Sequence, residues 1–330
     1  MIGLMRAELL RLRRRRSLQA IVLAVPLIVG VLFVLGYNSL TEQPPFDAAA
    51  YRQELIDGGF GLGLPPEQLE PLLAETIEAQ RQQIAQQDAN DRLIRATYAF
   101  PFSLVQVLGN GTFVLLALIL LTATTIGDEF GWATIRSSLI ASSRRGSFLV
   151  VRLAAMVVAG VLIFGLLVVL GTVLPLVLSI PPSKLPATLP DFDGGAFAVL
   201  IGGELVASVL VVAFAALFTL LLRNGALTLV SVLVWVAVEA AVLTLLIRFP
   251  NFGQGQPPPD AWLLDAFPLR GMTTLVGQAG RAATGLPSYP GEAVARDVGA
   301  AAVPIASFAI LAAILFALAF RRFTRMDIVE

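Results

Sequence analysis

The segment GDEFGWATIRSSLIASSRRGSFLVVR, residues 127–152, separates two long apolar runs and carries two acidic residues and four arginines. The apolar runs are 100–126 before it and 148–180 at its end. A charged passage in this position is either an ordinary loop or a segment to which another molecule binds outside the membrane. The composition of the rest of the chain decides whether a membrane is involved.

That composition is typical of a membrane protein. The chain has 330 residues, of which 57% are hydrophobic and 14% charged. Its mean hydropathy is +0.81, whereas soluble domains carry about 25% charged residues. The apolar composition makes the lipid bilayer the expected environment. The formal net charge is zero, which argues against a nucleic-acid partner.

The residues that most enzymes use are missing. The chain has no cysteine and no histidine, which excludes disulfides, thiolate and imidazole metal sites, and catalysis by either residue. Its single lysine, Lys184, lies in IPPSKLP and not in the glycine-rich loop that holds ATP phosphates in many ATPases. We therefore expect no catalytic residue, metal site or cofactor here, and any ATP and Mg²⁺ to be bound by another polypeptide.

Six apolar segments are long enough to cross a bilayer, which takes about 20 helical residues. The sequence therefore predicts an all-α polytopic membrane protein with six transmembrane helices. These are expected in residues 18–37, 100–126, 148–180, 196–222, 226–247 and 298–320. The third segment is too long for one straight crossing, so we expect it to tilt, to bend near Pro175 or to begin in the cytoplasm.

The placement of arginine predicts the orientation. If the amino terminus is inside, the inner segments hold an excess of arginine, beginning with the run RLRRRR at residues 11–16, and the outer segments hold most of the acids. The positive-inside rule then places both termini in the cytoplasm. We expect residues 1–17 to form a cytoplasmic amphipathic basic helix, and the protein to lie in the cytoplasmic (inner) membrane of the cell.

Two segments are predicted outside the cell. Residues 38–99 form an extracytoplasmic loop whose second half is rich in helix-forming residues. Its apolar stripe, which includes Leu69, Leu72 and Leu73, either packs on neighbouring segments or contacts a partner. Residues 249–297 form a second extracytoplasmic segment, in which the amphipathic stretch around Pro268 is too short to span and predicts a re-entrant or interfacial element.

Two acidic residues, Glu204 and Glu239, lie inside predicted spans. Carboxylates are costly in lipid and are candidate functional residues for that reason. Both are predicted in the outer half of the membrane, where water, Arg248 or Asn110 could satisfy them. They either fix helix packing through buried hydrogen bonds or handle a substrate or protons.

The charged interruption at 127–147 is cytoplasmic on the predicted topology. We expect Asp128 and Glu129 to occupy the first turn of a short helix, where the helix dipole favours acids, with Arg136 further along it. Phe130 and Trp132 are aromatic residues of the kind that anchors a segment at a membrane surface. The segment therefore predicts either a docking helix for a partner or simple interfacial anchoring.

This passage resembles the corresponding one in type-2 ABC transporter permeases. The matching positions are the acid Glu129, the threonine Thr134, the apolar Ile135 and Leu139, the polar close Ser143 and Arg144, and Arg152 in place of a lysine. Ala133 and Ser142 depart from the family's glycine and proline, which leaves the geometry of the turn open. The basic start, the six spans and the arginine-rich end FRRFTRMDIVE are also similar to the family's layout.

The resemblance implies the fold of a type V ABC exporter, with one permease domain over residues 1–330. It implies that 127–147 is a coupling helix that docks on a separate ATP-binding subunit, and that a second permease copy or a paralogue completes the pathway. The contacts with the ATPase subunit would be carried by Asp128, Glu129, Phe130, Trp132, Thr134, Arg136 and Arg144. The substrates that it suggests are drugs, peptide antibiotics, lipids or glycans, and sodium. The apolar spans favour an amphipathic or hydrophobic substrate over a small ion.

Two other functions fit the sequence. An ion-coupled secondary transporter would use the intramembrane acids Glu204 and Glu239, although the two halves of the chain show no convincing similarity of the kind that such carriers often have. A non-transporting membrane scaffold or sensor would use the outer segment 38–99 to bind a partner. Copurification with an ATP-binding protein distinguishes the exporter from both.

Overall fold

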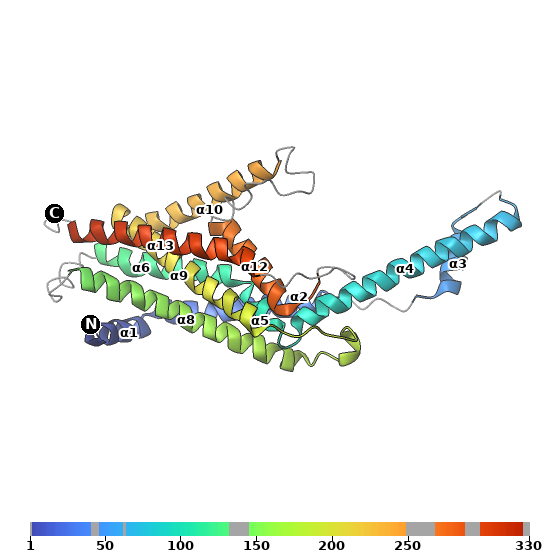
Figure 1. Ribbon diagram of the computed structural model, residues 1–330, viewed down its shortest axis with the longest axis horizontal. Coiled ribbons are helices and arrows are strands. Elements are labelled where there is room, and N and C mark those ends of the chain that lie inside the picture. The colour runs from blue at the N-terminus through green and yellow to red at the C-terminus, as the bar shows by residue number, and fades with distance from the viewer. Residues whose placement is uncertain are drawn as a thin grey trace.

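The computed structural model describes residues 2–40, 46–61, 64–131, 145–248, 268–287 and 298–325. The described residues form α-helices and one short 3-10 helix, Pro182–Lys184, and no strand occurs among them (Figure 1). Six of the helical segments are long and apolar enough to cross a membrane. The chain is therefore an all-helical, multi-pass membrane protein, as the sequence predicts.

The spanning segments are α2 (Arg16–Asn38), α5 (Ser103–Leu108) with α6 (Gly111–Gly131), α8 (Arg145–Leu178), α9 (Gly194–Leu222), α10 (Gly225–Arg248) and α13 (Gly299–Arg325). The remaining helices are α1 (Ile2–Arg14), α3 (Ala48–Asp57), α4 (Pro66–Tyr98) and α12 (Pro268–Thr284). Helix α8 continues through Pro175, and its 34 residues make it about 51 Å long. It is thus longer than a hydrocarbon core of about 30 Å.

The second predicted span is broken rather than continuous. Helix α5 ends at Leu108, and α6 begins at Gly111 after a turn at Gly109 and Asn110. In this turn the backbone N–H of Asn110 donates to the carbonyl of Val107 at 3.2 Å, and its side-chain amide donates to the carbonyl of Gln106 at 3.1 Å. Backbone groups freed at the break are thus satisfied locally, as a membrane interior requires.

Helix α9 is the centre of the bundle. It begins where the carboxylate of Asp193 accepts hydrogen bonds from the backbone N–H groups of Gly195 and Ala196, at 2.8 and 3.1 Å. Such a cap satisfies two of the donors that an α-helix leaves open at its start. From there α9 packs against α6, α8, α10, α12 and α13. It ends at Arg223, whose left-handed backbone (φ 51°) turns the chain into α10.

The bundle has two different ends, which Figure 1 shows on the left and on the right. Both termini and α1 lie at one end, here called the terminal end. Helix α4 projects from the opposite end, here called the arm end, and carries α3 along its outer part. Helix α12, which the structure describes from Pro268, packs on α9 and α13. Of the segment 249–297, the parts 249–267 and 288–297 lie outside the described residues.

The projecting helix α4 is fixed to the bundle at its base. The ring of Tyr98 packs edge-on against Phe33 and Tyr37 of α2, with centroid distances of 4.9 and 5.7 Å. Arg95 donates a hydrogen bond to the carbonyl of Leu40 at 3.0 Å. Burial raises the pKa of the Tyr98 phenol, and its hydrogen bond with Gln106 partly opposes this. These contacts join α4 to the end of α2.

A close backbone contact joins α6 and α10 near the terminal end. A Cβ atom at Gly127 would lie 2.5 Å from the Cα of Gly225, and one at Gly225 would lie 2.8 Å from the carbonyl oxygen of Ala123. Only glycine allows the two backbones to approach this closely.

We therefore expect Gly127→Ala to destabilise the protein by about 1–3 kcal/mol, because the added methyl forces α6 and α10 apart. The measurement is the thermal midpoint of the purified protein in detergent. Gly165→Ala in α8 is the matched control, since no atom lies within 4 Å of a Cβ at that position. Equal midpoints for the two variants would show that the contact does not hold α6 against α10.

Candidate functional site

An apolar cavity of about 250 Å³ lies between α10 and the helices α6, α9, α12 and α13. It is partly open, since its lining residues Leu116 and Trp235 are exposed. Its walls are built mainly from leucine, valine and isoleucine, with the aromatic rings of Phe214, Trp235 and Phe308. Glu239 is the only ionisable side chain among the described residues that line it. This cavity therefore brings one of the two predicted intramembrane acids to a place where a ligand could bind.

Helix periodicity explains why α10 presents this carboxyl to the cavity. Val232, Trp235, Val236 and Glu239 recur at the spacing that places side chains on one helix face, and all four line the cavity. Glu239 is 4% exposed. The Trp235 ring packs against Phe214 of α9 with a centroid distance of 5.6 Å, so that α9 and α10 meet through aromatic side chains beside the carboxyl.

Glu204 lies just beyond the cavity on α9. It precedes the lining residue Ala207 by three positions, so the two side chains share one face of the helix. Glu204 is 1% exposed, and neither of its carboxyl oxygens has a hydrogen-bond partner among the described residues. A Cβ at Gly111, the first residue of α6, would lie 2.6 Å from both of these oxygens, so the carboxyl occupies space that only a glycine leaves.

Of the partners expected for Glu204, Asn110 makes no hydrogen bond with it among the described residues. Asn110 is next to Gly111 in the chain, but its side-chain amide donates to the carbonyl of Gln106. The side chain of Arg248 is outside the described residues. Glu204 and Glu239 both lie in the half of their helices nearer to the arm end, which is the half that the sequence assigns to the outside.

The structure places part of the predicted coupling segment on α6. Asp128, Glu129 and Phe130 belong to the last turn of α6, which continues to Gly131. The expectation that the two acids start a separate helix is therefore wrong. Trp132, Thr134, Arg136 and Arg144 lie outside the described residues.

A buried ion pair that sequence reasoning missed lies at the terminal end. Arg152 of α8 is 2% exposed, and its Nε lies 3.2 Å from a carboxyl oxygen of Glu8 in α1. The guanidinium carbon lies 5.0 Å from the centre of the Phe148 ring, a distance typical of a cation–π contact. Glu8 is the only acid within residues 1–17, which is the signal that could have identified it.

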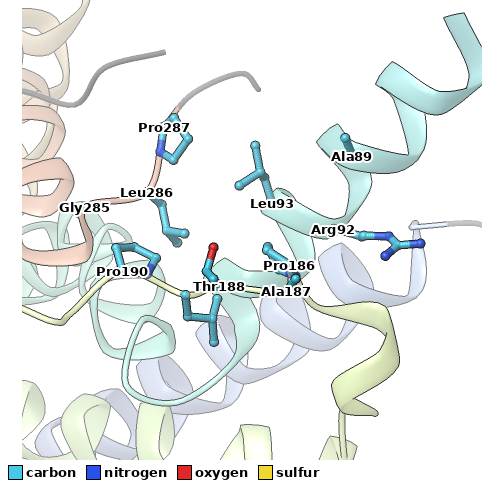
Figure 2. Close-up of a pocket in the computed structure, with 11 residues that line it drawn as sticks. Ala89, Arg92, Leu93, Pro186, Ala187, Thr188, Pro190, Gly285, Leu286 and Pro287 are labelled. Carbon is cyan, nitrogen blue, oxygen red and sulfur yellow. The ribbon is translucent and has the colours of Figure 1, made fainter. Parts of the chain in front are cut away.

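A second, larger cavity of about 570 Å³ lies at the arm end. Figure 2 shows that it is bordered by the base of α4, by the segment 186–190 and by the segment 285–287. Pro186, Pro190 and Pro287 contribute to its walls. The only charged lining residue that the structure describes, Arg92, pairs with Asp88 at 2.8 Å. No sequence pattern pointed to this cavity.

The described residues contain no group of three or more side chains that could hold a metal ion. Compared with protein-family models, with curated proteins and with solved structures, the chain matches none. The chemistry of the site therefore has to be argued from its own residues. They form an apolar binding space with one carboxyl in its wall and a second carboxyl buried behind it.

Because a buried carboxyl without a partner lowers stability, we expect Glu204→Met to raise the free energy of unfolding by about 1–3 kcal/mol. The thermal midpoint measures it. Ser208→Ala is the control, since Ser208 is buried one turn further along α9 and donates only to the backbone carbonyl of Glu204. A lower midpoint for Glu204→Met would show that another group satisfies this carboxyl.

Proposed function

We propose that this chain is the permease subunit of an ATP-driven exporter with the fold of type V ABC exporters. Both termini then lie in the cytoplasm, and the protein lies in the cytoplasmic membrane. A separate nucleotide-binding subunit holds ATP and Mg²⁺ and hydrolyses the ATP. A second permease copy or a paralogue completes the pathway, and the substrate is an amphipathic or hydrophobic molecule such as a drug, peptide antibiotic, lipid or glycan.

The observation that carries this proposal is the continuity between the charged segment and the cavity wall. Helix α6 contributes Thr112, Leu115, Leu116 and Ile119 to the cavity and then runs without a break to Gly131, where the charged segment follows. A force applied to that segment is therefore transmitted along a single helix to the binding space. A stiff helix between two sites can move as a rigid body. In this way a local change at one end of the helix can open the binding space at the other end.

The other side of the segment is also held. It leads into α8, whose Arg152 is fixed to Glu8 of α1 and to Phe148. In the proposed mechanism, ATP-driven closure of the partner subunits pushes the segment, α6 and α8 move together with α1, and the substrate site changes the side to which it opens. Glu129 and Arg136 supply polar contacts to the partner, and Trp132 supplies a packed anchor.

One observation favours a second function, an ion-coupled secondary transporter. Glu204 is buried next to the start of α6 without a hydrogen-bond partner among the described residues. A buried acid that no neighbour stabilises is a candidate carrier of protons or cations in transporters. In reconstituted vesicles, uptake driven by a proton gradient without ATP would favour this function, whereas uptake that needs the ATPase subunit would favour the exporter.

The exporter proposal predicts that charge reversal in the segment uncouples the permease from its ATPase subunit. We expect Glu129→Arg and Arg136→Glu each to lower substrate-stimulated ATPase activity by about tenfold or more, because fully desolvated polar contacts at an interface contribute about 2 kcal/mol or more. The assay uses the permease copurified with its ATPase subunit. Arg81→Glu on the projecting helix α4, where the arginine side chain is 64% exposed, is the matched control. Unchanged stimulation in both segment variants would exclude this docking site.

A further inference from the structure

The wall of the 250 Å³ cavity combines an acid with aromatic rings. Glu239 lies one helical turn beyond Trp235 on the same face of α10, and the Phe214 ring packs against Trp235 at 5.6 Å between centroids. Phe308 of α13, which is fully buried, lines the same space. The described lining residues include no arginine and no lysine.

This combination has a specific chemical meaning. The faces of tryptophan and phenylalanine attract cations, and grouped aromatic rings bind quaternary ammonium groups in this way. A carboxylate in an apolar wall adds a charge that attracts cations and repels anions, with less screening than in water. An apolar cavity without such an acid would instead prefer neutral molecules, because burying an unpaired charge is costly.

We propose that this cavity binds a small lipophilic cation, with the aromatic rings around its alkylated ammonium group and Glu239 as the counter-charge. The volume of about 250 Å³ is slightly below the roughly 300–1,000 Å³ that is usual for small-molecule sites. It therefore suits a cation with one aromatic ring rather than a peptide or a glycan. The inference that such a cation is exported rests on the proposed function, whereas its binding does not.

The chain provides its own reporter for the test. It has three tryptophans, and replacing Trp132 and Trp262 by phenylalanine leaves Trp235 in the cavity wall as the only one. The probe is 4-bromobenzyltrimethylammonium, whose bromine quenches tryptophan fluorescence on close contact. Its matched partner is 1-bromo-4-neopentylbenzene, in which carbon replaces the charged nitrogen and the shape is the same.

We expect saturable quenching of Trp235 by the cation in the full-length protein in lipid nanodiscs, with an affinity about tenfold higher than that of the neutral compound. Glu239→Gln should lower the affinity for the cation about tenfold and leave the affinity for the neutral compound unchanged. Equal affinities for the two compounds, or cation binding that survives Glu239→Gln, would overturn the proposal.

Two further variants keep the test decisive. Phe214→Leu removes an aromatic ring without changing charge. It should lower the affinity for the cation more than the affinity for the neutral compound, which provides a second test if Glu239→Gln does not fold. A protein whose only tryptophan replaces Ile310, which is 61% exposed on α13, reports quenching from the surrounding lipid. Quenching at Trp235 that rises without saturation, as expected at position 310, would also overturn the proposal.

The same experiment separates this inference from the proposed function. Binding is measured without ATP or an ATPase subunit, so that it can succeed while the exporter proposal fails. If the cation binds but does not change the ATPase activity of the complex, the site is a cation site without a part in ATP-driven export. If the complex is active with other substrates and the cation does not bind, only the substrate class is wrong.

Discussion

Lipid cannot hydrogen-bond to the peptide backbone, and this constraint governs both the architecture and its exceptions. The six spanning segments of the described chain are helical throughout, apart from the turn at Gly109 and Asn110. That turn survives because Val107 and Gln106 accept its donors. It also ends α5 and starts α6 at Gly111, beside the carboxyl of Glu204. The one break in the regular backbone thus lies next to a buried acid.

The same constraint makes the buried ionisable side chains informative, because each has to be compensated or has to be retained for another reason. Arg152 is compensated by Glu8 and Phe148, so that its burial is explained by the attachment of α1 to α8. The carboxyl oxygens of Glu204 have no hydrogen-bond partner among the described residues. The burial of Arg152 is thus explained by helix packing at the terminal end, whereas packing within the described residues does not explain the burial of Glu204.

The number and positions of the spans could be predicted because a bilayer imposes a minimum apolar length on every crossing. Apolar length does not predict the break at Gly109, although Gly109-Asn110-Gly111 is a sequence that favours a turn. The sequence also identifies Glu204 and Glu239 as acids inside predicted spans. Only the packing of the helices shows that Glu239 lies in one cavity wall with aromatic rings of α9 and α13. The pairing of Glu8 with Arg152 joins residues far apart in the chain, which a pattern along a single helix cannot detect.

The position of the cavity relative to the glycine contact suggests how the bundle could work. Helix α10 touches α6 through Gly127 and Gly225 near the terminal end, and both helices line the cavity further along. Two helices held by a close backbone contact can pivot there with little loss of packing, since few side chains lie between them. A small rotation about this contact would change the separation of Thr112 and Glu239. Along α6 the contact at Gly127 lies close to the point where the charged segment follows in the sequence, whereas Thr112 of the cavity wall lies about four helical turns before it.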